Sequence, residues 1–136
     1  KFMRSLLFLP LLLGFSFPAI AQTKTYKIDV SAESYRNYIL NGTDRNGSVS
    51  ENDPKVAVNK GDTIIFSVNA SRHPFYVKTE IYWGSSNQVI TWKLSGMPGT
   101  QNGNLAWNTK GVAAGKYFYV CSPLASFGMS GSIIVE

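Results

Sequence analysis

Three side chains of this sequence are of types that could together bind a soft metal ion. Cys121 is the only cysteine and His73 the only histidine among the 136 residues, and Met129 follows Cys121 by eight positions. A thiolate, an imidazole and a thioether are the ligand types that copper prefers. These three residues are therefore the candidate metal ligands, provided that the fold brings His73 to the segment between Cys121 and Met129.

The first 21 residues have the pattern of a secretory signal peptide. Lys1 and Arg4 give a basic start, an apolar run follows over residues 6–18, and the small residues Ala19 and Ala21 end the segment. We expect cleavage after Ala21, export to the periplasm or secretion, and no stable membrane span in the mature chain. The alternative is an uncleaved membrane anchor.

Export makes the single cysteine informative, because exported cysteines usually form disulfides in pairs. Cys121 has no partner within the chain. It must therefore be a buried thiol, a reactive thiol, half of an intermolecular disulfide, or a metal ligand.

The composition of the chain limits its fold class and its partners. Residues 22–136 suffice for one domain, and 44% of all residues are hydrophobic, which is enough to form a core. The net charge is +5, but the basic residues are dispersed singly. Nucleic-acid binding is therefore a poor interpretation, and we expect a monomeric single domain over residues 22–136.

Apolar and polar residues alternate along much of this domain, as in half-buried β-strands. The alternation is clearest over residues 25–30, 55–59, 63–68, 116–121 and 131–136. Turn residues separate these segments, and no stretch keeps a helical period. The pattern predicts an all-β Greek-key sandwich or barrel of about six to eight strands.

Local patterns lead to more specific expectations. Residues 59–62 (N-K-G-D) lie between two alternating runs and predict a hairpin. Residues 41–54 are polar and rich in turn residues, so we expect an exposed loop there. Residues 89–94 predict a strand. Three tryptophans are expected to fill the core or cover one end of the sandwich: Trp83, Trp92 and Trp107.

The surroundings of His73 favour a position at the end of a strand. Pro74 biases His73 towards an extended conformation. A strand that begins at Phe75 would leave His73 at one end of the sandwich, where ligand loops are normally carried.

Together these segments resemble the plastocyanin-like cupredoxins, the blue-copper family, over about residues 25–136. The likeness is strongest over 61–77 (G-D-T-I-I-F-S-V-N-A-S-R-H-P-F-Y-V) and 116–135 (K-Y-F-Y-V-C-S-P-L-A-S-F-G-M-S-G-S-I-I-V). The family loop reads Cys-x-x-His-x-x-x-x-Met, so Cys121 and Met129 match two ligand positions and His73 matches the upstream histidine. Leu124 stands where the family has its second histidine.

The resemblance implies a non-enzymatic protein that binds one copper ion and exchanges one electron with a redox partner, or copper with a donor or acceptor. Leucine has no donor atom, so Leu124 implies an altered site with three ligands. Cu(I) should suffer less from this loss than Cu(II), because it accepts two or three soft ligands. In the family, the missing histidine is also the usual entry point for electrons.

Two other interpretations remain open. Leu124 could simply fill the ligand position, which would leave a metal-free binding or structural module. Alternatively, Cys121 and His73 could serve a thiol enzyme, although the sequence contains no readable orienting residue or oxyanion motif.

Overall fold

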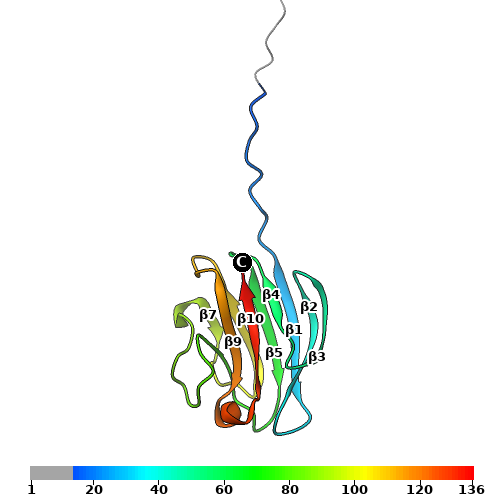
Figure 1. Cartoon of the computed structure of the whole chain (residues 1–136), viewed down its shortest axis with the longest axis vertical. Helices are drawn as coiled ribbons and strands as arrows, with labels where there is room; N and C mark the ends of the chain where they lie inside the picture. Colours follow the sequence, from blue (N-terminus) through cyan, green and yellow to red (C-terminus); the bar gives the residue numbers. More distant parts are fainter. Residues whose placement is uncertain (1–13) are drawn as a thin grey trace, which may run out of the picture.

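Ten strands form two stacked sheets in the computed structural model, which describes residues 14–136 (Figure 1). The first sheet has the strand order β3-β2-β1-β5-β8-β7 and the second β4-β10-β9-β6. The strands are β1 (Thr25–Ala32), β2 (Tyr38–Asp44), β3 (Gly47–Asn52), β4 (Val56–Val58), β5 (Thr63–Asn69), β6 (Phe75–Lys78), β7 (Leu94–Gly96), β8 (Asn102–Asn108), β9 (Gly115–Cys121) and β10 (Ser130–Val135). The predicted all-β sandwich is confirmed, with more strands than expected.

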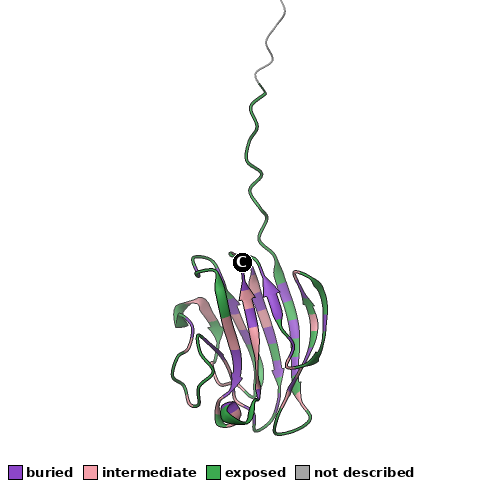
Figure 2. Cartoon of the chain, viewed as in Figure 1, coloured by how far each residue is buried: buried purple, intermediate pink, exposed green. Residues whose placement is uncertain are grey.

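Most of the segment before β1 extends away from the sandwich (Figure 1), and only its end is held there, where the Lys24 N–H donates to the Asp62 carboxylate at 2.9 Å. Residues 14–24 form no strand or helix and are exposed, whereas buried residues alternate along the strands (Figure 2). Most of the expected signal peptide, residues 1–13, lies outside the described residues. Within residues 14–136, the structure contains no helix with the length and apolar character needed to cross a membrane.

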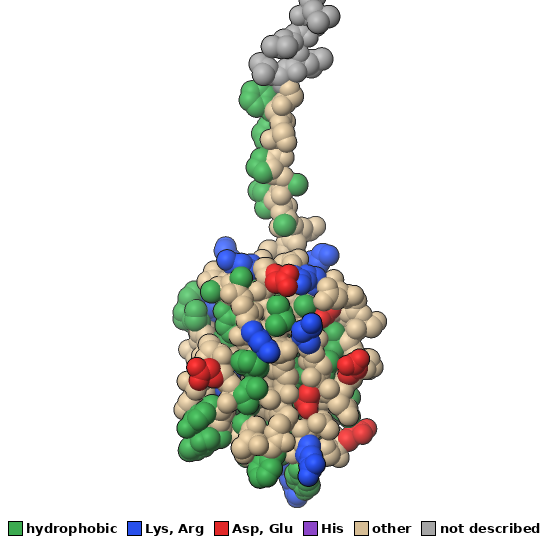
Figure 3. Space-filling view, viewed as in Figure 1, with side chains coloured by type: hydrophobic (Ala, Val, Ile, Leu, Met, Phe, Trp, Pro, Cys, Tyr) green, Lys and Arg blue, Asp and Glu red, His purple; other side chains and the backbone are tan. Residues whose placement is uncertain are grey.

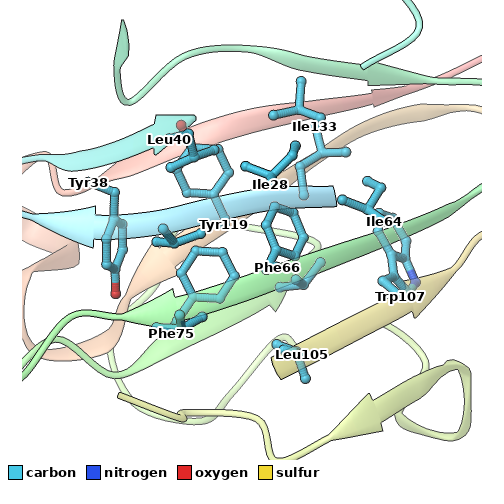
Figure 4. Packing of buried hydrophobic residues seen from close by; sticks show 14 of the residues in the cluster. Ile28, Tyr38, Leu40, Ile64, Phe66, Phe75, Leu105, Trp107, Tyr119 and Ile133 are labelled. Atoms are coloured by element: carbon cyan, nitrogen blue, oxygen red, sulfur yellow. The ribbon is translucent and has the colours of Figure 1, made fainter. Parts of the chain in front are cut away.

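The alternating side chains of β1 and β5 explain why these strands form the centre of the first sheet. They run parallel and in register, with Tyr26 opposite Ile64 and Ile28 opposite Phe66. The inward residues of both strands are buried and meet Tyr119 of β9 from the second sheet (Figure 4). The period-two pattern thus marked the core faces correctly.

The hairpin predicted around residues 59–62 is wrong. Asn59 and Asp62 do form a turn, in which the Asn59 N–H donates to the Asp62 carboxylate at 2.9 Å. The two flanking strands, however, belong to different sheets: β4 pairs with β10, and β5 pairs with β1 and β8. All three residues of β4 are buried. Pairing with β10 in the second sheet therefore gives this short strand a fully buried position.

The exposed loop predicted over residues 41–54 is also wrong, because most of this segment forms the hairpin of β2 and β3. Only the turn at residues 45–46 matches the expected turn chemistry. Gly42 lies inside β2, where a Cβ atom would collide with the main chain of Lys27 and Ile28 in β1. Glycine at this position therefore allows β1 and β2 to lie close together and does not form a turn.

The region between β6 and β8 also differs from expectation. Residues 91–93 form a short 3-10 helix, η1 (Thr91–Lys93). Of the strand expected over residues 89–94, only Leu94 lies in a strand, β7. Trp107 is fully buried in the core, as expected. Trp83 and Trp92 are 66% and 74% exposed, and the Lys93 ammonium covers the Trp92 ring at 4.1 Å from its centroid.

The carboxyl group of Asp53 should make the stability of the fold depend on pH. It accepts a hydrogen bond from the Tyr38 N–H at 2.8 Å, and burial raises its pKa from 3.8 to about 6. The folded protein therefore retains a proton that the unfolded chain releases between about pH 4 and pH 6. We expect this group to lower the free energy of unfolding as the pH rises through that window, and to contribute no further change above it.

Urea denaturation at several pH values checks this expectation. Asp53→Asn, which keeps an oxygen to accept the Tyr38 N–H, should remove this part of the pH dependence. An identical dependence in the variant and the wild type would contradict the assignment to Asp53.

Candidate metal centre

Pairing of β6 with β9 brings the predicted upstream histidine to the cysteine. The two strands run antiparallel with Phe75 opposite Cys121. His73 lies two residues before Phe75, and Cys121 is the last residue of β9. The expectation that His73 lies at the end of a strand, close to Cys121, is therefore confirmed.

A short 3-10 helix, η2 (Ser122–Phe127), carries the chain from Cys121 to Met129. Gly128 ends it with a φ angle of +88°, a left-handed conformation that glycine adopts without strain. The chain then turns back, so that the Cys121 N–H donates to the Met129 carbonyl at 3.0 Å. This places the methionine beside the cysteine at the end of the sandwich farthest from the N-terminal tail (Figure 1).

The two potential strong ligands face each other in a dry environment. The Cys121 Sγ atom lies 3.7 Å from the His73 Nδ1 atom, and the side chains are 0% and 7% exposed. A metal held at roughly 2.0–2.3 Å from each atom with a trigonal angle would separate them by about 3.8 Å. The observed spacing therefore fits a shared metal ion, and Met129 is fully buried in the same cluster as Cys121.

Burial favours the neutral form of both candidate ligands in the metal-free protein. It lowers the pKa of His73 and raises the pKa of the Cys121 thiol. A neutral imidazole is ready to bind a metal, whereas the thiol must first release its proton. Metal binding should therefore release a proton from Cys121.

Leu124 lies in η2 and packs, partly buried, against the core. Its side chain lines a shallow apolar hollow of about 250 Å³ together with Tyr35, Arg36 and Phe127. Within residues 14–136, no group of three or more His, Cys, Asp and Glu side chains is arranged to hold a metal ion. A third protein ligand in this region must therefore be of another type, such as the thioether of Met129.

The structure adds two tyrosines that the sequence did not single out. The rings of Tyr35 and Tyr38 lie 5.8 Å and 6.4 Å from the imidazole of His73, centroid to centroid. The Tyr38 hydroxyl also donates to the main-chain carbonyls of His73 and Pro74, at 3.0 and 3.1 Å. No local pattern could have revealed them, because they reach His73 only through the packing of one sheet on the other.

A two-sheet β-sandwich with cysteine, histidine and methionine side chains at one end defines the cupredoxin class of protein. Residues 38–136 match the family described as copper binding proteins, plastocyanin/azurin family. The chain belongs to this family, and the resemblance drawn from the sequence is confirmed.

Solved structures show the same fold. The copper protein rusticyanin is similar with a TM-score of 0.53 and 20% identity, over 85% of this chain and 80% of that one. A structure of rusticyanin from Thiobacillus ferrooxidans gives a TM-score of 0.52 and 20% identity, over 85% and 79%. A search of curated proteins found no match. The family and the soft donor set support copper as the cofactor.

Proposed function

We propose that this chain is an exported copper protein in which His73, Cys121 and Met129 hold one copper ion that carries a single electron. The observation that carries the proposal is the 3.7 Å separation between Cys121 Sγ and His73 Nδ1 in a buried site. Copper, when bound, would supply the Cu(I)/Cu(II) couple. The protein would supply one thiolate, one neutral imidazole and one thioether in a site closed to water.

The altered loop should favour the reduced metal. Cu(I) is satisfied by two or three soft ligands, whereas Cu(II) prefers an additional nitrogen ligand. Leu124 offers hydrocarbon where the family has an imidazole, and its position against the core supports a role in excluding water. We therefore propose a site with a preference for Cu(I), suited to a high-potential electron carrier or to a protein that receives and delivers Cu(I).

The surface around this end supports docking of a partner. Several hydrophobic side chains are exposed at the end of the molecule opposite the tail (Figure 3), and Tyr35 and Phe127, beside Leu124, are 64% and 69% exposed. We propose that a redox partner, or a copper donor or acceptor, contacts this end. The mature protein would be a monomeric domain over residues 22–136, released by cleavage after Ala21.

A thiol enzyme is a weaker proposal for the same residues. Cys121 is fully buried, and burial raises its pKa, so that the nucleophilic thiolate is disfavoured. A reactive cysteine is normally accessible and has a lowered pKa. These observations support a metal ligand or an inert thiol over a catalytic nucleophile.

Titration of the metal-free mature protein with copper tests the proposed function. We expect one equivalent of Cu(I) to bind tightly enough to compete with a colorimetric Cu(I) chelator, because three soft ligands converge. Cu(II) should bind more weakly and give a thiolate-to-copper absorption much weaker than that of a complete blue site. Protein whose Cys121 has been alkylated in urea and then refolded is the control and should not compete.

Failure to compete for Cu(I) would contradict the proposed function. If the wild-type protein competes no better than the alkylated control, the site does not bind Cu(I). The metal-free module that the sequence left open would then be the better interpretation.

A further inference from the structure

The hydroxyl group of Tyr38 lies where two segments of the metal centre meet. Tyr38 is fully buried and occupies one end of the core, with Trp107 at the other (Figure 4). Its ring packs edge-on against His73 and, at 5.2 Å between centroids, against Phe75. Its hydroxyl donates to the carbonyls of His73 and Pro74 at 3.0 and 3.1 Å, so it fixes the main chain that carries the histidine.

Hydrogen bonds hold the main chain around His73 from several sides. The His73 N–H donates to the Ala70 carbonyl at 3.0 Å, and the Pro74 carbonyl also accepts from the Ser122 N–H at 3.3 Å. Pro74 itself has no N–H to donate. The His73 carbonyl accepts from the Tyr38 hydroxyl, so this buried side chain links the segment that carries the imidazole to β2 of the other sheet.

We propose that Tyr38 is a positioning residue of the metal centre, which fixes the main chain at His73 and thereby sets the direction of its imidazole relative to Cys121. This inference rests on the ligand set proposed above. The hydroxyl reaches two consecutive carbonyls, and the ring lies edge-on to the imidazole. The 3.7 Å separation between Cys121 Sγ and His73 Nδ1 therefore depends on where Tyr38 holds this segment.

The anchoring of Tyr38 supports this role. Its N–H donates to the Asp53 carboxylate at 2.8 Å, and its carbonyl accepts from the Asp53 N–H at 2.8 Å. The start of β2 is therefore held on both sides. A ring fixed in this way can hold the hydroxyl at one place while the metal binds or changes its oxidation state.

Tyr38→Phe tests the proposal, with Tyr119→Phe as the matched control. Tyr119 is also fully buried in the core, but its hydroxyl donates to the Pro54 carbonyl at 2.6 Å and not to the segment that carries His73. Both variants keep the ring and lose one buried hydroxyl, so their melting temperatures should fall similarly. We expect Tyr38→Phe to weaken Cu(I) binding at least about tenfold and Tyr119→Phe less than about threefold, as for partners that orient metal ligands.

A second measurement needs no metal. In the metal-free protein, nuclear magnetic resonance signals of the His73 ring and of the Phe75 N–H, which shares a peptide group with the Pro74 carbonyl, should shift in Tyr38→Phe and stay nearly unchanged in Tyr119→Phe. A merely structural hydroxyl would affect both variants alike. Equal shifts, or equal Cu(I) affinities, would overturn the proposal.

The outcomes separate this proposal from the proposed function. If the wild-type protein fails to bind Cu(I), the copper function fails, and the metal-free signals alone decide whether Tyr38 positions His73. If the wild type binds Cu(I) but the two variants bind it equally well, only the role of Tyr38 fails. If Tyr38→Phe does not fold, the hydroxyl proton signals of the wild type decide: the Tyr38 signal must move on Cu(I) addition more than that of Tyr119.

Discussion

Leu124→His is expected to give a protein that binds Cu(II) and shows an intense visible absorption from its thiolate-to-copper charge transfer. The substitution adds the second imidazole to the proposed set of His73, Cys121 and Met129. Residue 124 follows Cys121 by three positions, in the short helix η2, and its side chain lines the same hollow as Tyr35, which packs on His73. An imidazole of similar size to leucine can therefore be placed beside both ligands.

The expected gain is large. Loss of residues that only orient a ligand costs about 10–100-fold in metal affinity. Addition of a direct ligand should thus raise Cu(II) affinity by at least about 100-fold. Competition with a Cu(II) chelator, together with absorption and electron paramagnetic resonance spectra, measures the change.

A control histidine on the same helix separates a specific ligand from a general effect of imidazole. Ser126 is exposed and lines a different hollow, together with Ile81, Tyr82, Trp83 and Ala125. Ser126→His should therefore leave the spectra of the wild type unchanged. A colourless Leu124→His protein that is folded would show that residue 124 does not face the metal position.

Cys121→Ser is expected to abolish Cu(I) binding, with a loss of at least about two orders of magnitude in affinity. The thiolate is the only charged and the strongest ligand of the proposed set, and a serine hydroxyl is a poor ligand for a soft metal. The fold should survive, because serine is close to cysteine in size and the neighbouring His73 imidazole can hydrogen-bond to the new hydroxyl.

Met129→Leu provides the comparison for this variant. Met129 is fully buried, and exchange of methionine for leucine conserves volume, at a cost below about 1.5 kcal/mol in stability. A weak axial thioether should contribute less than the thiolate, so we expect a loss of only about tenfold in Cu(I) affinity. Chelator competition and thermal unfolding of both variants provide the test. Equal losses, or a Cys121→Ser protein that still binds Cu(I), would contradict the assigned ligand roles.

Part of the centre could be predicted from the sequence because it is local. Cys121 and Met129 lie on one segment between two alternating runs, and the short return of the chain brings them together. His73 could be placed as well, since Pro74 and the run from Phe75 indicated the start of a strand. The pairing of Phe75 with Cys121 then confirmed the arrangement.

Tyr38 illustrates what local patterns could not provide. This residue is fully buried in β2. Its contact with His73, 35 positions along the chain, depends on which strands lie opposite each other. That choice follows from the burial of whole sheet faces and not from the identity of neighbouring residues.

The errors at residues 41–54 and 59–62 have the same origin. Polar residues and Asn-Gly pairs favour turns, yet the first Asn-Gly pair lies within β2, because Gly42 allows close contact with β1. The turn at 59–62 exists, but it connects two sheets instead of two paired strands. Turn residues thus indicated where the chain bends and did not specify which strands pair afterwards.

The sequence by itself determined the two-layer β-sandwich, the soft ligand types and the presence of a single histidine, because alternation, spacing and residue counts are properties of the chain alone. Only the tertiary structure decided that His73 Nδ1 and Cys121 Sγ lie 3.7 Å apart, because β6 and β9 pair within one sheet. It also decided that Tyr38, from the other sheet, lies against His73. These contacts form only when distant strands pair and both sheets close over one core, which no single stretch of sequence encodes.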